Sequence, residues 1–112
     1  MATLTVSNIS RTTGVNITDD EVAAAGGGDV FANDGKTFFI VDNGGSSITV
    51  TFAGVAQCDQ GSTHNLAVTV GASKRLMFGP FETGRYNNAS GQVAVTYSAV
   101  TTVNVLATKR LA

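Results

Sequence analysis

Short stretches in which apolar and small polar residues alternate recur along this chain. The clearest are residues 3–7, 47–52, 66–70, 93–98 and 102–105, where Val, Leu, Ile, Phe or Tyr takes every second position. A period of two places successive side chains on opposite faces of a β-strand. Each run therefore predicts a strand with one face on a core and one on solvent. The β-branched Val and Thr that dominate these runs suit such a surface.

Turn signals separate the predicted strands. Asp34-Gly35 precedes the apolar run 36–41, and Asn43-Gly44-Gly45 leads from it into 46–52. Asn-Gly supplies the positive φ angles of tight turns, so we predict a hairpin between these two runs. Residues 38–41 are apolar at every position, which predicts a central strand covered on both sides. Six to eight strands of this kind indicate an all-β fold, a small antiparallel β-sandwich or barrel that is jelly-roll-like or Ig-like.

The N-terminal part departs from this pattern after Val6. Thr18 is a candidate helix N-cap, three acids follow it, and residues 26–28 are all glycine. This pattern allows one or two helical turns at most, and the glycine triplet favours a mobile loop. We therefore expect a single domain in which residues 1–30 form an N-terminal strand and an irregular arm, and residues 31–112 form the β-sandwich.

Charge is scarce and unevenly placed. Charged residues make up 13% of the 112 residues, against a typical share of about 25%. Residues 1–60 hold seven acids and two bases, whereas residues 61–112 hold one acid and five bases. The asymmetry favours contacts between copies or docking on a charged surface, unless it is only a solvated dipole. The net charge of −1 argues against nucleic acid as a partner. The short apolar runs argue against a membrane span, and the N-terminus lacks the pattern of a secretory signal.

Residues with the chemistry of an active site are few. His64 and Cys58 are the only histidine and cysteine, too few for a zinc site. Residues 26–28 lack the Gly-Lys-Ser/Thr ending of a phosphate-binding loop. The adjacent acids 19–21 do not face a common substrate, and the acids do not follow calcium-loop spacing. We therefore expect no catalytic residue, no metal site and no cofactor, and the prediction is that the chain is not an enzyme.

One segment brings cations close to aromatic residues, as proteins that stack single-stranded bases do. It contains Lys74, Arg75, Phe78, Phe81, Arg85 and Tyr86. Three cations in a slightly acidic chain are too few for such a site. The alternative is that the aromatic side chains fill the edge of the core or a subunit contact. A neutral, Thr-rich surface also needs little desolvation when another protein covers it, which favours an assembly component or a binding module.

The C-terminal half carries a recognisable pattern in residues 66–70, Gly79-Pro80-Phe81, Arg85-Tyr86-Asn87 and 91–98, and residues 33–38 and 43–50 fit it. Over about residues 29–111 the chain resembles the head decoration, or cement, proteins of tailed bacteriophages. The resemblance implies a structural virion protein that binds the capsid exterior after expansion. It also implies a homotrimer that bridges neighbouring major capsid protein subunits, and production in the cytoplasm of the bacterial host.

The contact residues are hypotheses of our own and are not implied by the resemblance. We expect capsid contacts at Arg11, Lys74, Arg75 and Arg85, and subunit contacts at Phe78, Phe81 and Tyr86. The N-terminal segment is the expected arm that orders on binding, so that removing residues 1–28 should leave the β domain folded. Two other functions stay open: another virion component, such as a head–tail joining or tail protein, and a carbohydrate-binding sandwich. The absence of Trp and the presence of only two Tyr argue against the latter.

Overall fold

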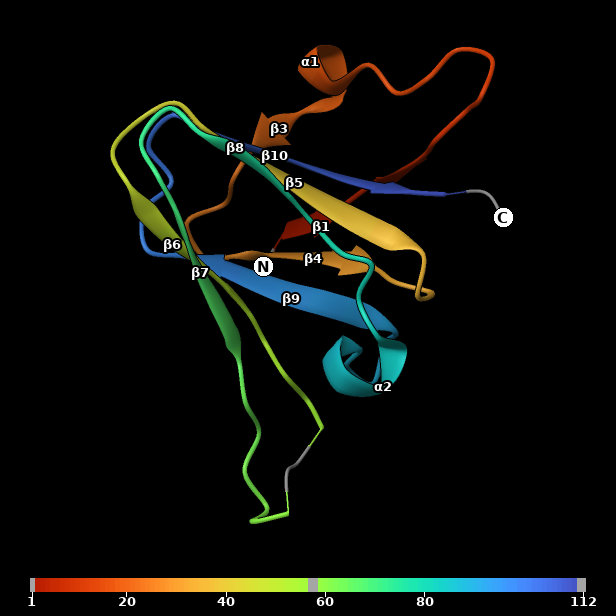
Figure 1. Cartoon of the computed structure of the whole chain (residues 1–112), viewed down its shortest axis with the longest axis vertical. Helices are drawn as coiled ribbons and strands as arrows, with labels where there is room; N and C mark the ends of the chain where they lie inside the picture. Colours follow the sequence, from red (N-terminus) through yellow and green to blue (C-terminus); the bar gives the residue numbers. More distant parts are fainter. Residues whose placement is uncertain (1, 57–58, 111–112) are drawn as a thin grey trace.

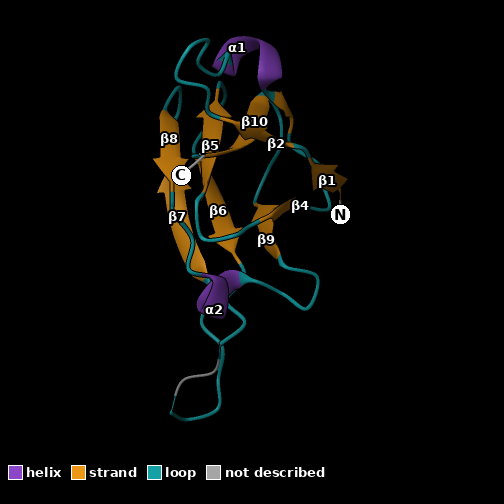
Figure 2. Ribbon diagram, turned by 90° about the vertical axis from the view of Figure 1, so that its right-hand side faces the viewer, coloured by secondary structure: helices purple, strands orange, loops and turns teal. Residues whose placement is uncertain are grey.

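Two β-sheets packed against each other form the molecule (Figure 1, Figure 2). The computed structural model describes residues 2–56 and 59–110. Sheet 1 has the strand order β1 (Ala2–Leu4), β4 (Asp29–Ala32), β9 (Gln92–Tyr97), β6 (Ile48–Phe52) and β7 (Leu66–Val70). Sheet 2 has the order β2 (Val6–Asn8), β10 (Val103–Lys109), β5 (Thr37–Asn43) and β8 (Arg75–Phe78), with β3 (Val22–Ala23) also paired to β10. The predicted all-β sandwich is confirmed.

The strand pairing selects one of the architectures left open above. Four antiparallel pairs are nested, so that β3 pairs with β10, β4 with β9, β5 with β8, and β6 with β7. This is one long hairpin of eight strands rolled across two sheets, which is the jelly-roll arrangement. Parallel pairs occur only where β1 joins β4 and β2 joins β10 among the described residues.

The core lies between the sheets and is built from the alternate residues that the sequence pattern indicated. Phe31, Phe39 and Phe52 are fully buried there, together with valines of β5, β6, β9 and β10. The rings of Phe31 and Phe39 stack with centroids 5.0 Å apart, and the ring of Phe52 meets Phe39 edge-on at 5.7 Å. Packed aromatic pairs of this kind supply much of the buried area of a small core that lacks Trp.

The hairpin predicted at residues 43–45 is wrong. β5 lies between β10 and β8 in sheet 2, whereas β6 lies between β9 and β7 in sheet 1, so the two strands do not pair. Asn43 is fully buried at the end of β5, and its amide nitrogen donates to the carbonyl oxygens of Ser46 at 2.8 Å and Val70 at 3.2 Å. Gly45 lies so close to residues 101–102 that a Cβ would be 3.2 Å from the Thr101 carbonyl. Asn-Gly-Gly therefore makes a tight crossover between the sheets.

The expected central strand at residues 38–41 is confirmed. β5 has a partner on each side, and Ile40, which points away from the core between the sheets, is still only 7% exposed. Buried residues on both faces explain why this run is apolar throughout, since an interior strand covered on both sides has no solvent face to fill with polar residues.

The N-terminal segment is less irregular than expected. The predicted strand at 3–7 divides at Thr5, so that β1 joins sheet 1 and β2 joins sheet 2. Leu4 packs in the core. Removing residues 1–28 would therefore remove three strands and two core side chains, those of Leu4 and Ala24, so that both sheets would lose strands. The irregular part is confined to the stretch between β2 and β4.

That stretch contains a single helical turn. The described residues form two helices, α1 (Ile17–Asp20) and α2 (Thr83–Tyr86), and each has four residues. The cap of α1 is Asn16, whose side chain accepts from the Asp19 amide, and not the predicted Thr18. Within the described ranges, no helix is long and apolar enough to cross a membrane.

Candidate functional site

The four cations expected to contact a capsid do not form one surface. Arg11 lies in the loop after β2, Lys74 in the turn before β8, and Arg75 at the start of β8, whereas Arg85 lies in α2. All four are exposed. Figure 1 shows α2 beyond the end of β8 that is opposite to Arg75. The cations are therefore distributed over separate parts of the molecule, and a shared basic docking patch is not supported by their placement.

The aromatic residues expected at a subunit contact lie mostly inside the chain. Phe81 and Tyr86 are 3% and 7% exposed, and Phe78 is half-buried against the same core. The ring of Phe81 contacts Phe52 with centroids 4.9 Å apart and Tyr86 at 5.4 Å. Phe81 and Tyr86 therefore fill the edge of the core, the alternative stated above, and do not present a surface to a partner in this conformation.

The charge asymmetry of the sequence is partly cancelled by folding. Arg75 Nη2 lies 2.8 Å from Asp42 Oδ2 and 3.4 Å from Glu21 Oε1, and Lys109 Nζ lies 3.4 Å from Asp34 Oδ2. Each of these ion pairs joins an acid of residues 1–60 to a base of residues 61–112. These ion pairs neutralise part of the opposite charge of the two halves within one chain. This weakens the case for head-to-tail contacts between copies.

The Glu21, Asp42 and Arg75 side chains form the densest charged cluster. The Glu21 side chain is 7% exposed, and its Oε2 is buried without a hydrogen-bond partner among the described residues. Burial, followed by the negative charge of Asp42, raises the pKa of Glu21. The hydrogen bond from Arg75 lowers the pKa of Asp42. No group of three His, Cys, Asp or Glu that could hold a metal ion occurs among the residues described, and here the third member is a guanidinium.

A second buried carboxyl group lies at one end of the core. Asp29 is fully buried; its Oδ2 accepts from the Tyr97 hydroxyl at 2.6 Å and from the Ala25 amide at 3.3 Å. Burial raises the pKa of the Tyr97 hydroxyl far above its usual value, and the hydrogen bond to Asp29 is the second cause of this shift. Tyr97 lies on β9 and Asp29 on β4, so their hydrogen bond joins neighbouring strands of sheet 1. The hydrogen bond from the Ala25 amide joins Asp29 to the segment before β4. Asp29 is enclosed and Tyr97 is partly buried, which suits a structural role.

The loop between β6 and β7 extends away from both sheets at the lower end of Figure 1. Its base is fixed where the amides of Val55 and Ala56 donate to the Arg85 carbonyl at 2.7 and 3.4 Å. Gly54 approaches the main chain of His64 so closely that a Cβ would collide with it. His64 is exposed in this loop, and Cys58 lies outside the described residues.

An uncharged surface covers the outer side of sheet 1. Its outward positions alternate with the core residues of β1, β4, β6, β7 and β9, and they align across the strands, as in the register of Thr51 with Ala67 and Thr96. We call this surface the neutral face; it consists of Thr3, Val30, Ala32, Thr49, Thr51, Ala67, Thr69, Gln92, Ala94 and Thr96. Every one of these residues is small or medium-sized and uncharged. The sequence pattern assigned the outward positions of four of these strands, but only the sheet order shows that they share one surface.

Comparisons with protein-family models, with curated proteins and with solved structures find no match to this chain. The fold and the surfaces described above therefore carry the functional argument.

Proposed function

We propose that this protein is a structural virion component that binds the outer surface of a bacteriophage capsid and stabilises it by bridging neighbouring major capsid subunits. The observation that supports the proposal is the neutral face, which spans all five strands of sheet 1. Monomeric proteins usually keep such a surface charged for solubility. A neutral face instead reduces the desolvation cost when a second protein covers it.

Bridging also explains how modest contacts suffice. A protein that touches two capsid subunits binds the assembled shell more strongly than either subunit alone, and a homotrimer multiplies the effect. Binding to the assembled shell but not to separate subunits stabilises the shell by mass action. The jelly-roll fold occurs in viral capsid proteins, but also in lectins and cupins, so the fold alone does not select this function.

Thr96→Lys tests the neutral face directly. Thr96 is exposed on β9, in the middle of sheet 1, so a lysine there should be tolerated by the fold but would place an unpaired charge in the interface. Binding to expanded capsids, measured by co-sedimentation, should weaken by about tenfold or more. Asn104→Lys on the exposed outer side of β10 is the matched control and should leave binding unchanged.

Equal binding by both variants would overturn the assignment of the neutral face, and the absence of wild-type binding to capsids would overturn the capsid function. Arg85→Glu is a further arm, because reduced binding by this variant would assign the contact to the α2 end instead. A closed ring by native mass measurement together with binding to a tail or portal vertex would identify the alternative, a head–tail joining or tail component.

The carbohydrate-binding alternative has less structural support. Glycan binding by stacking needs aromatic rings at the surface, whereas the exposed large hydrophobic side chains of the described residues are Ile17, Val22, Val55 and Met77. Tyr86 is buried and Tyr97 is hydrogen-bonded to Asp29 inside the sandwich. That the chain is not an enzyme stays a prediction.

A further inference from the structure

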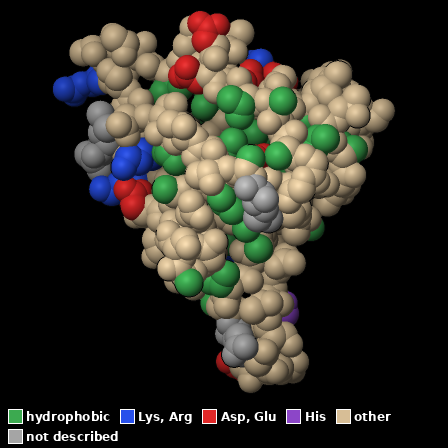
Figure 3. Space-filling view, turned by 180° about the vertical axis from the view of Figure 1, so that it is seen from behind, with side chains coloured by type: hydrophobic (Ala, Val, Ile, Leu, Met, Phe, Trp, Pro, Cys, Tyr) green, Lys and Arg blue, Asp and Glu red, His purple; other side chains and the backbone are tan. Residues whose placement is uncertain are grey.

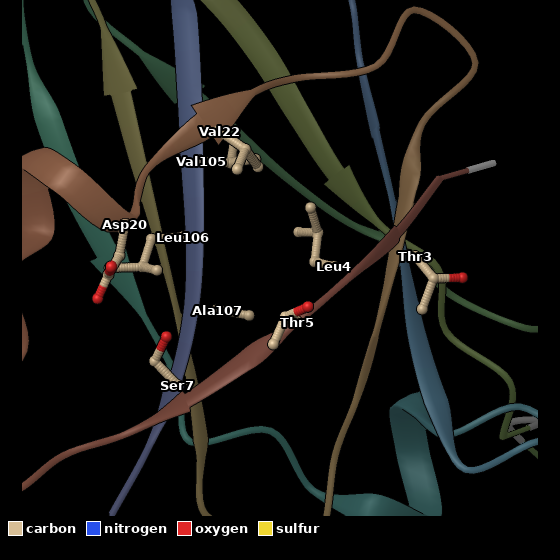
Figure 4. A pocket seen from close by; sticks show the side chains of 9 residues that line it. All are labelled: Thr3, Leu4, Thr5, Ser7, Asp20, Val22, Val105, Leu106 and Ala107. Atoms are coloured by element: carbon tan, nitrogen blue, oxygen red, sulfur yellow. The ribbon is translucent and has the colours of Figure 1, made fainter.

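Sheet 2 has a gap along one edge of β10. β2 pairs with Ala107–Lys109, and β3 pairs with Asn104 and Val105, so both short strands lie on the same edge. Between β2 and β3, residues 9–21 leave the sheet, form a loop and α1, and lead back to the edge of β10. Leu106 is the residue left between the two pairings. The gap opens a cavity of about 290 Å³ (Figure 4), which we call the β10 slot.

The two ends of the β10 slot differ in chemistry. Figure 4 shows the side chains of Leu4, Val22 and Val105 directed toward one another at one end, with Ala107 beside them. Leu4, Val105 and Ala107 belong to the core, so this end is a continuation of the apolar interior. Val22 is 48% exposed and forms the apolar rim.

The other end of the slot is polar and acidic. Asp20, the last residue of α1, lies beside Leu106, and the hydroxyl-bearing side chain of Ser7 completes this part of the lining, whereas Thr5 lies nearer Leu4 and Ala107. A carboxylate and a hydroxyl provide three oxygen acceptors. The slot thus has an apolar end and an oxygen-lined end in a single cavity.

The charge at the acidic end is not neutralised by the chain itself. Glu21, Asp42 and Asp34 have basic partners, whereas Asp20 forms no ion pair with any residue of the described ranges. Figure 3 shows this side of the sandwich, where β1 and the start of the chain lie. Hydrophobic side chains gather in its middle and acidic side chains lie above them.

We propose that the β10 slot receives a lysine side chain of a partner protein. The aliphatic stem of a lysine would pack on Leu4, Val22 and Val105, and its ammonium would donate to the carboxylate of Asp20 and to the hydroxyl of Ser7. A compact ammonium with three donors fits three separate oxygens better than the planar guanidinium of arginine does.

This inference deepens the proposed function. The identification of the partner as a capsid subunit rests on the proposed function. The preference of the slot itself can be measured without a capsid. The probe is lysine blocked as its Nα-acetyl N-methylamide, titrated into ¹⁵N-labelled full-length protein and followed by amide chemical shifts. The expected shifts concentrate at residues 4–7, 20–22 and 105–107. Blocked norleucine, which has an apolar stem without the ammonium, should bind more weakly.

Two variants separate the contributions of the slot's ends. Asp20→Asn should weaken the blocked lysine by about fivefold and leave blocked norleucine unchanged. Val22→Ser should weaken both probes, because it removes part of the apolar wall. Asp20 and Val22 are exposed, so both variants should fold, which a far-ultraviolet spectrum checks. Glu82→Gln, which removes one exposed acid on the α2 side, is the charge-matched control and should bind like the wild type.

Shifts scattered over the surface, equal affinity for lysine and norleucine, or equal effects of Asp20→Asn and Glu82→Gln would each overturn the proposal. Co-sedimentation of Asp20→Asn with capsids then tests the partner separately. If the slot binds lysine but the protein does not bind capsids, the lysine site is retained and the capsid function is rejected. If Asp20→Asn leaves capsid binding unaffected, the slot is rejected as a capsid contact.

Discussion

Asn43 holds the crossover that replaces the predicted hairpin, and its removal tests that role. Its amide nitrogen lies within hydrogen-bond distance of the Ser46, Val70 and Gly71 carbonyl oxygens, at 2.8, 3.2 and 3.2 Å. Its Oδ1 accepts from the Gly45 amide at 3.1 Å. One side chain therefore links the end of β5 to the start of β6 and to the β7–β8 turn.

The magnitude follows from what Asn43→Ala leaves behind. Val70 is fully buried, and leaving a buried carbonyl without a partner costs about 1–3 kcal/mol. Water can replace the Asn43 side chain at the part-buried Ser46 and Gly71 carbonyls and the Gly45 amide, where each lost hydrogen bond costs about 0.5–1 kcal/mol. We expect the free energy of unfolding to fall by about 3 kcal/mol. For a chain of this size the melting temperature should fall by about 10 °C.

Urea unfolding followed by far-ultraviolet circular dichroism measures this change. Asn104→Ala, an exposed asparagine on β10, is the matched control and should change stability by less than about 0.5 kcal/mol. Asn43→Asp preserves the size and the acceptor for Gly45 but turns an oxygen toward the carbonyl groups, so it should destabilise more than alanine at neutral pH. If Asn43→Ala and Asn43→Asp both unfold like the control, the crossover does not depend on this amide and the reasoning is refuted.

Two further predictions concern the buried carboxyl groups. Tyr97→Phe should lower the free energy of unfolding by about 2–3 kcal/mol, because a hydrogen bond to the enclosed Asp29 is lost. Burial raises the pKa of Tyr97 in the folded state. The stability that the protonated hydroxyl provides in the wild type should therefore be present below pH ~10 and lost above it. An unchanged urea midpoint for this variant would contradict the buried contact. Burial also raises the pKa of Glu21, so the folded state retains a proton that the unfolded state releases, and wild-type stability should fall as the pH rises through that raised value. Glu21→Gln should remove this dependence and be equally stable or up to about 1 kcal/mol more stable at pH 7, whereas a loss there would show that ionised Glu21 stabilises the fold through Arg75.

The candidate site residues were harder to predict than the strands. Arg75 was identified as a contact residue from its charge, but folding places Asp42 and Glu21 beside it. Phe81 and Tyr86 were identified from their proximity to cations in the sequence, which carries no information on whether a ring points into the core. The β10 slot had no sequence signal, because it arises from the place where two strands end along β10.

The alternation of apolar and small polar residues determined that this chain forms strands, and it assigned most inward and outward positions. Such assignments are local, since neighbouring side chains in any strand point to opposite faces. The tertiary structure decided which strands pair, because pairing depends on contacts between residues distant in sequence. Asn43-Gly44-Gly45 illustrates the difference: the same residues suit a hairpin turn or a crossover, and the buried carbonyl of Val70, 27 residues away, selects the crossover. The neutral face exists only because that crossover places β6 beside β9.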